Sequence, residues 1–335
     1  MSKIKIALDE YPFLLSRNIG PNIFLKRLAA EFKKKNYRVT NRFNPFYDIG
    51  LFNIENKSFF NKPYVIRIGG LYFDKKNTIA NTEKENAKIL EGIKNSEGVI
   101  FVCDFTRKLT ESLYGKLLKP YTVINNSVPT NTFSPIGENK RKLLNLNNND
   151  FVIVASSSWR RHKRLEEIIV FFEKLSLKLS NLKLLILGEV KKKPKHNNRK
   201  VIFSGKINHN NLPSWYRTGN IFFHFAWIDH SPNTLVEAAA CGLPSLCTNN
   251  GGSREIIERS KSGIVSNADS EYQYKLVDLY NPPVPNYNIL EADFLKIYNN
   301  LNLFKNNINY NELSINKSAE KYLTFLKQIH VSKNN

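Results

Sequence analysis

The stretch HSPNTLVEAAACGLPSLCTNNGG, residues 230–252, has the residue pattern best suited to binding an anion. Ser231 is a strong candidate N-cap, and Pro232 suits the first helical position because it has no N–H to leave unpaired there. The next amides, those of Asn233 and Thr234, lie at the positive end of the helix dipole. Together they predict a site for a phosphate or another anion.

Two carboxylates accompany this helix start. Glu237 lies four residues beyond Asn233 on the same helical face, where it could accept hydrogen bonds from a ribose diol. Asp229 precedes the cap and lies within reach of sugar hydroxyls. Local chemistry leaves an alternative open, in which an ordinary capped helix carries a solvated Glu237 and Asp229 is only a loop residue.

A cluster of cations occurs in ASSSWRRHKRLEE, where a strand with small residues is predicted to turn into a helix. Arg160, Arg161, Lys163 and Arg164 place four formal charges within five residues, and these repel one another unless they share an anion. Fixed cations of this kind stabilise the charge on a departing diphosphate. The alternatives are a solvated basic loop and a nucleic-acid patch.

The elements that must position these residues follow from short apolar runs that alternate with longer amphipathic stretches. This alternation predicts parallel sheets wound with helices, whose ligands bind outside the carboxyl ends of the strands. A polar stretch at 137–150 contains no strong strand, so we place a domain boundary there. The predicted strands are 3–8, 48–54, 64–68, 98–103, 122–127, 151–157, 182–188, 201–205, 221–227, 244–249 and 263–266, and the predicted helices are 21–37, 81–96, 163–175, 211–219, a helix from 232 and a segment at 253–259.

Length and composition bound the class of protein. A chain of 335 residues with 41% hydrophobic residues predicts two folded domains. A net charge of +21 predicts attraction to polyanions such as nucleic acid, anionic lipid or phosphorylated small molecules. Three cysteines without a CxxC pair favour buried thiols in a reducing compartment, and neither metal ligation nor a signal peptide or membrane span is expected. We therefore expect a cytoplasmic protein.

The sequence resembles the retaining family-4 glycosyltransferases of GT-B fold, also described as glycosyl transferases group 1. Their signature has an acidic residue, seven intervening residues and a glutamate, followed by A-x-x-x-G-x-P and GG-x-x-E. The matching positions are Asp229, Glu237, Ala238, Gly242, Pro244, Gly251, Gly252 and Glu255. Looser similarity at 65–75, 97–109, 123–135, 201–227 and 318–329 extends the resemblance over nearly the whole chain.

The resemblance implies two facing Rossmann-like, doubly wound parallel-sheet domains, with a C-terminal helix that crosses back to the first domain. The expected boundaries are 1–140 for the acceptor domain, 141–310 for the nucleotide-sugar donor domain and 311–335 for the returning helix. It implies catalytic roles for Asp229, Arg160, Lys163 and Glu237. The implied donor-binding residues are Ser158, Arg161, Gly205, Lys206, Ile207, Ser231, Pro232, Asn233, Thr234 and Gly20.

Within that set, the resemblance implies that Glu237 holds the ribose, that Asp229 contacts the donor sugar and that Lys163 neutralises the departing diphosphate. The sequence departs from the family at Ser157 and Ser158, where the family has a Gly-Arg pair. Arg160 or Arg161 must then fill the arginine's role, and the sequence does not distinguish them. A glycine pair near the N-terminus is reduced to Gly20.

The mechanism implied by the resemblance is same-face attack, in which the leaving phosphate takes the acceptor's proton and no metal or other cofactor takes part. The expected partners are a nucleotide sugar and a glycan or lipid-linked acceptor. Residues 21–38 form a basic amphipathic helix that predicts either peripheral contact with an anionic membrane or a helix that covers the sheet.

Two further hypotheses stay open: a nucleic-acid-modifying transferase, disfavoured because aromatic and basic residues do not interleave, and a non-catalytic basic binding protein on a transferase scaffold.

Overall fold

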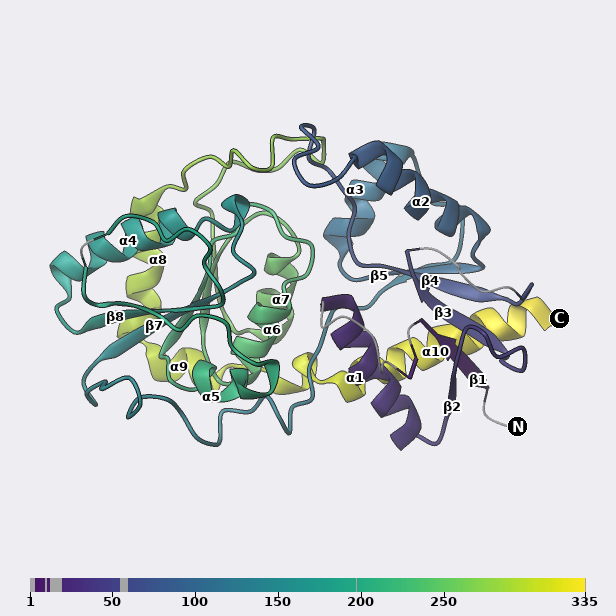
Figure 1. The fold of residues 1–335 in the computed structure, drawn as a ribbon, viewed down its shortest axis with the longest axis horizontal. Helices are drawn as coiled ribbons and strands as arrows, with labels where there is room; N and C mark the ends of the chain where they lie inside the picture. The colour runs from purple at the N-terminus through teal and green to yellow at the C-terminus, as the bar shows by residue number, and fades with distance from the viewer. Residues whose placement is uncertain (1–3, 10, 13–19, 55–59, 197, 335) are drawn as a thin grey trace. The chain divides into compact units, whose positions relative to one another are not determined.

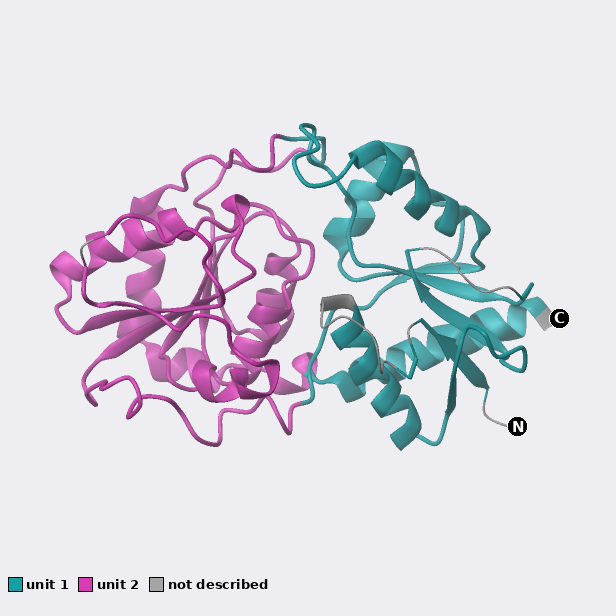
Figure 2. Cartoon of the chain, in the orientation of Figure 1, with its two compact units in different colours: residues 1–129, 274–277, 314–335 teal, residues 130–273, 278–313 magenta. Residues whose placement is uncertain are grey.

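The computed structural model describes residues 4–9, 11–12, 20–54, 60–196 and 198–334. The chain divides into two compact units (Figure 2). Unit 1 comprises residues 1–129, 274–277 and 314–335, and unit 2 comprises residues 130–273 and 278–313. Each unit contains a six-stranded sheet whose strands all pair in parallel.

The sheet of unit 1 has the strand order β2-β1-β3-β4-β5-β6. Helices α1 and α10 cover one face and α2 and α3 cover the other (Figure 1). The elements are β1 (Lys5–Leu8), α1 (Gly20–Lys34), β2 (Arg38–Asn41), β3 (Ile49–Asn53), β4 (Tyr64–Ile68), α2 (Thr82–Asn95), β5 (Gly98–Phe101), α3 (Asp104–Tyr114), β6 (Tyr121–Val123) and α10 (Ile315–Asn334).

The sheet of unit 2 has the order β12-β11-β10-β7-β8-β9. Helices α4 and α8 pack on one face in a large aromatic core, and α6 packs between α5 and α7 (Figure 1). The elements are β7 (Phe151–Ser156), α4 (Leu165–Lys178), β8 (Leu182–Leu187), β9 (Val201–Phe203), α5 (Leu212–Tyr216), β10 (Ile221–His224), α6 (Asn233–Ala240), β11 (Ser245–Thr248), α7 (Ser253–Ser260), β12 (Gly263–Ser266), α8 (Tyr287–Asn299) and α9 (Leu301–Asn306).

The units do not follow the predicted boundaries. Residues 130–140 belong to unit 2, where the Arg217 guanidinium donates to the carbonyls of Ser134 and Glu138 at 3.1 and 2.8 Å. The polar segment thus belongs to unit 2 through side-chain bonds to its backbone, without a strand of its own. Residues 274–277 belong to unit 1, where Val277 bridges to Asp74. The chain returns to unit 1 at residue 314, three residues later than predicted.

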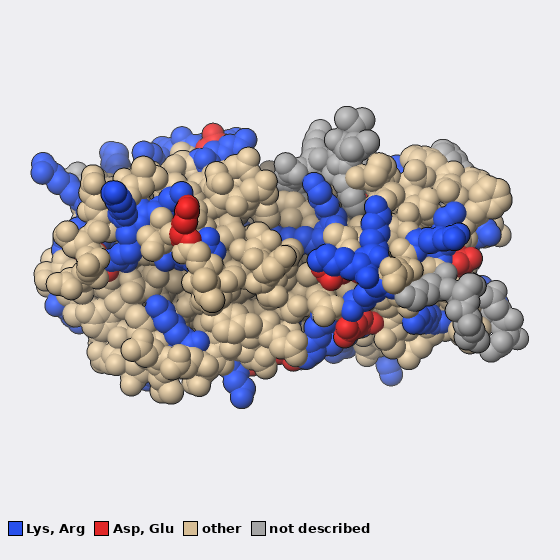
Figure 3. Space-filling view, turned by 90° about the horizontal axis from the view of Figure 1, so that it is seen from below, with Lys and Arg blue, Asp and Glu red and all other residues tan. Residues whose placement is uncertain are grey.

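The helix at the start of unit 1 does not offer its apolar face to a membrane. Phe24, Leu28 and Phe32 are fully buried in the core that α1 shares with α10. The structure therefore favours the alternative in which this helix covers the sheet. The lysines of α1 stay exposed, and one face of the molecule shows far more Lys and Arg than Asp and Glu (Figure 3).

Candidate active site

The predicted donor-binding residues other than Gly20 lie in unit 2, on loops that follow strands of its sheet. β10 pairs with β7 on one side and with β11 on the other, in parallel register. The turn after β7, the loop after β10 and the loop after β11 therefore leave the same edge of the sheet. This is the edge at which open α/β sheets bind ligands.

Lys163 and Asp229 lie in direct contact at this edge. The Lys163 ammonium donates to Asp229 Oδ2, and their side chains are 15% and 18% exposed. Burial opposes the charge on Asp229, but Lys163 and His224 outweigh it and lower the pKa of Asp229 to about 2. His224 Nε2 lies 3.7 Å from the same oxygen, and burial lowers the pKa of His224 to about 4. At neutral pH the site therefore holds an ionised Asp229 beside a neutral imidazole.

The glycine pair after β11 positions Asp229. Gly252 N donates to the carbonyl of Asp229 at 2.8 Å. Gly251 has φ +86°, and a Cβ there would come within 2.8 Å of the Asp229 amide nitrogen and closer still to its carbonyl oxygen. Only glycine gives this left-handed conformation and this close approach without strain. The Gly-Gly pattern seen in the sequence thus serves to bring β11's loop against Asp229.

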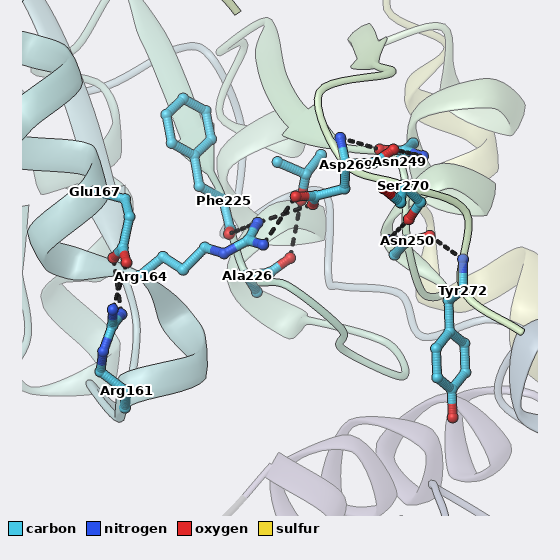
Figure 4. A network of polar contacts seen from close by, with 11 residues as sticks. Arg161, Arg164, Glu167, Phe225, Ala226, Asn249, Asn250, Asp269, Ser270 and Tyr272 are labelled. Atoms are coloured by element: carbon cyan, nitrogen blue, oxygen red, sulfur yellow. Dashed lines mark hydrogen bonds and ion pairs between the residues drawn. The ribbon is translucent and has the colours of Figure 1, made fainter. Parts of the chain in front are cut away.

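The repulsion expected among the four cations after β7 does not occur, because three of them have their own carboxylates. Arg161 makes two bonds to Glu167, at 2.9 and 2.6 Å, and Arg164 makes two to Asp269, both at 2.8 Å (Figure 4). Lys163 forms an ion pair with Asp229. These charges therefore need no shared anion, contrary to the expectation from the sequence. The exposed Arg160 has no carboxylate partner among the described residues.

The Arg164–Asp269 pair is a buried anchor for the site. The two side chains are 0% and 1% exposed. Asp269 N donates to Asn249 Oδ1 at 3.0 Å, and Asn249 Nδ2 donates back to the Asp269 carbonyl at 3.1 Å (Figure 4). Because Asn249 follows β11, this network holds the loop that carries Gly251. Breaking such a pair from one side typically costs about 3–5 kcal/mol.

Helix α6 begins one residue later than predicted. Pro232 is the N-cap and Asn233 the first helical residue, and no side-chain bond caps the helix. The half-buried Ser231 therefore lies before the cap, because the extended backbone at Pro232 (φ −68°, ψ 115°) delays the first turn. Thr234 is half-buried in that first turn. The predicted exit is confirmed, since Gly242 adopts φ +83° after the C-cap Cys241.

Glu237 is buried in unit 2, which excludes the alternative of a solvated side chain. It is 2% exposed, and its two oxygens lie 3.1 Å from His209 Nε2 and 3.3 Å from Tyr216 Oη. Burial and the Glu237 charge raise the pKa of Tyr216 well above its ordinary value, so the phenol is a hydrogen-bond donor. His209 and Tyr216 were missed from the sequence, because their separations of 28 and 21 residues from Glu237 carry no motif.

The predicted donor-binding segment Gly205, Lys206 and Ile207 follows the end of β9, beside the end of β8. Gly188 N donates to the Gly205 carbonyl at 3.1 Å, and Gly205 has φ +71° with open space beside it. Gly188 was also missed, although a Cβ there would approach the Ser157 carbonyl to 2.5 Å. Lys206 is exposed and Ile207 is half-buried, and the exposed Ser158, also predicted to bind the donor, follows β7. The predicted Gly20 begins α1 in unit 1.

The described part of the chain holds no group of three or more His, Cys, Asp or Glu side chains arranged to ligate a metal. None of its helices combines the length and the apolar character that crossing a bilayer requires.

Known proteins resemble this chain in both sequence and fold. Residues 137–276 match the family described as Glycosyl transferases group 1, whereas no curated protein matches the sequence. Sucrose-phosphate synthase from Thermosynechococcus elongatus is similar with a TM-score of 0.68 at 13% identity, over 99% of this chain and 98% of that one.

Two other solved structures are similar over comparable lengths. Anabaena Alr3699/HepE, in complex with UDP and glucose, has a TM-score of 0.66 at 12% identity, over 97% of this chain and 100% of that one. WaaG, a glycosyltransferase involved in lipopolysaccharide biosynthesis, has a TM-score of 0.60 at 13% identity, over 96% and 99%. With the two parallel sheets, these likenesses confirm the predicted GT-B fold, including the return of α10 to the first domain. The family match supports a glycosyltransferase.

Proposed function

We propose that the chain is a retaining glycosyltransferase that moves a hexose-type sugar from a nucleoside diphosphate sugar to a glycan or lipid-linked acceptor. The observation that carries the proposal is the contact of Lys163 with Asp229 immediately before α6. It joins a phosphate-binding cation to a sugar-binding carboxylate at one strand edge. UDP is named with Alr3699/HepE, and UDP with GlcNAc is named with the transferase GtfA, which supports this class of donor.

The charges of the site fit the departure of a diphosphate. In our proposal Lys163 turns from Asp229 to the diphosphate, and the exposed Arg160 joins it, because Arg161 is held by Glu167. Asp229 can then accept hydrogen bonds from the donor sugar, and its pKa of about 2 keeps it ionised for that role. Glu237, held by His209 and Tyr216, accepts from the ribose hydroxyls.

The proposed reaction breaks the bond between the anomeric carbon and the diphosphate oxygen and forms the new glycosidic bond on the same face of the sugar. A leaving-group oxygen takes the proton of the acceptor hydroxyl. The protein supplies orientation and fixed positive charge, which together can account for a large part of a transferase's rate. The cations involved are side chains, so we propose that no metal takes part.

The experiment is a thermal-shift screen with UDP, GDP and ADP and their common sugar conjugates, followed by measurement of sugar release. We expect one conjugate to raise the melting temperature and to be hydrolysed slowly, and we expect hydrolysis to be lost in Glu237→Ala. Glu237→Gln keeps the buried shape, and Glu258→Ala, whose side chain is 56% exposed on α7, is the matched control.

Three outcomes separate the hypotheses. Loss of hydrolysis in the Glu237 variants with retention in Glu258→Ala supports the transferase. Nucleotide binding without any sugar release would overturn it in favour of a non-catalytic binding protein. Tight duplex binding with a steep salt dependence and no nucleotide-sugar binding would instead favour a protein acting on nucleic acid.

A further inference from the structure

Two arginines are among the largest fully buried side chains of the protein, and they are paired differently. Arg164, in unit 2, has both oxygens of Asp269 as its partners. Arg67, in unit 1, is 2% exposed and has no carboxylate partner among the described residues. A buried guanidinium keeps its charge at every physiological pH and is costly to bury without a counter-charge. Arg67 is therefore a buried charge of unit 1 that has no counter-charge among the described residues.

The bonds of Arg67 hold it in place without neutralising it. Its Nε donates to the Tyr322 hydroxyl at 3.1 Å, Nη1 to Asn53 Oδ1 at 3.2 Å and Nη2 to Asn126 Oδ1 at 2.7 Å. The Phe24 ring lies against it, 4.5 Å from the guanidinium carbon. These partners use three of its five N–H groups, so the two remaining N–H groups have no acceptor among the described residues.

Arg67 lies at the edge of its sheet where open α/β sheets bind ligands. It lies in β4, Asn53 ends β3 and Asn126 follows β6, so the three side chains meet at the carboxyl edge of the first sheet. The nearby acid Asp9 is engaged elsewhere, since it accepts from Asn53 N at 2.6 Å and lies 3.5 Å from Arg42 Nη1. It leaves Arg67 without a negative charge.

An approach to Arg67 exists beside Gly69. This glycine is exposed, and a Cβ built on it would lie 3.7 Å from Arg67 Nη1, in ordinary van der Waals contact. Among the described residues, no other heavy atom beyond the chain neighbours of Gly69 lies within 4 Å of that point. The absent side chain thus leaves one flank of the guanidinium reachable from the surface.

We propose that this edge of unit 1 binds an anionic oxygen group, a phosphate or a carboxylate, carried by the sugar acceptor, with Arg67 as its counter-charge and Asn53 and Asn126 as the residues that orient Arg67. Naming the bound molecule as the sugar acceptor rests on the proposed glycosyltransferase function. Anion binding itself is measured without any sugar transfer, so the two proposals fail separately.

The test is hydrogen–deuterium exchange on the full chain in inorganic phosphate or in sodium acetate, each compared with sodium chloride at equal ionic strength. Peptides spanning 64–73 and 121–128 belong to unit 1, so their exchange reports on this site and not on binding in unit 2. We expect protection of both peptides, by phosphate if the group is a phosphate and by acetate if it is a carboxylate. Gly69→Leu should raise the half-saturating concentration of the effective anion by roughly tenfold, by filling the approach.

Arg67→Gln should abolish the protection, but it also removes bonds that tie α10 to the sheet. Gly69→Leu keeps all of those bonds, and the exposed Thr324→Leu on α10 is the control for an added apolar side chain. A purely structural Arg67 predicts no protection by either anion, or the same protection in Gly69→Leu as in the wild type. Either result would overturn the proposal, whatever the outcome of the donor experiments.

Discussion

Replacing Gly251 by alanine should damage the proposed reaction by moving Asp229. The added Cβ would come within 2.8 Å of the Asp229 amide nitrogen, whereas ordinary contact begins at 3.4 Å, so the Asp229 backbone must retreat by at least 3.4 − 2.8 = 0.6 Å. A misplacement of about 1 Å can cost about 100-fold in rate, so we expect sugar transfer or donor hydrolysis to fall by roughly 10- to 100-fold. The left-handed backbone at φ +86° adds about 1–2 kcal/mol of destabilisation.

Gly115→Ala separates these two effects. Gly115 has φ +89° in unit 1, and its new Cβ would meet nothing within 4 Å, so it shares the backbone strain without the clash. Melting temperatures should therefore fall in both variants, while kcat should fall only in Gly251→Ala. The assay is release of sugar from the donor identified by the thermal-shift screen. Wild-type kcat in Gly251→Ala, or an equal loss in both variants, would refute the role given to the glycine pair.

Four other perturbations test the remaining assignments. Arg160→Ala should weaken nucleoside diphosphate binding by about tenfold in calorimetric titration, whereas Arg161→Ala, whose partner is Glu167, should change it by less than about threefold; the reverse order would contradict our choice between them. His209→Ala should weaken the same binding by roughly fivefold by releasing Glu237, with partial rescue in His209→Gln, and an unchanged Kd would remove His209 from the site. Burial lowers the pKa of His162 to about 3 and of His224 to about 4, below the value of 6.5 in the unfolded chain. Because the folded state then binds fewer protons than the unfolded state, the free energy of unfolding should be highest above about pH 6.5 and should fall as the pH is lowered toward 4. Between pH 7.5 and pH 5, His224 alone should account for about 2 kcal/mol of lost unfolding free energy, measured by urea unfolding. A wild-type stability equal at the two pH values would show that these imidazoles are not buried. Any binding to anionic vesicles should be electrostatic, weaken with salt and fall by about 1 kcal/mol per lysine in Lys33→Glu and Lys34→Glu, whereas binding that survives high salt would mean that α1 exposes its apolar face.

Periodic apolar patterning was sufficient to predict most of the fold from the sequence. All of the central strands were expected, because buried parallel strands read as short apolar runs. The edge strand β2 (Arg38–Asn41) was missed, since RVTN is short and polar and follows a helix without a break. Helix α3 was also missed, because its cap is Cys103, a residue type that sequence reasoning does not count as a cap.

The site was predictable where its residues are close in sequence and not where they are distant. The Asp229–Glu237–Gly251 spacing identified the loops after β10 and β11, since the motif lies within one short stretch. The partners of the cations were not predictable. Glu167 lies in the following helix and Asp269 lies 105 residues beyond Arg164, so their charges could not be matched to the basic turn without coordinates. For that reason the sequence wrongly predicted that the cations of this turn lack carboxylate partners.

The return of α10 sets the order in which this chain can mature during synthesis. Seven of the twenty buried residues that form the core of unit 1 around α1 belong to α10: Ile315, Ala319, Tyr322, Leu323, Phe325, Leu326 and Ile329. The ribosome makes the whole of unit 2 before it makes any of them. The apolar surface of nascent unit 1 therefore stays uncovered until α10 has been synthesised. A fragment that spans residues 1–140 lacks this helix and should be prone to aggregation.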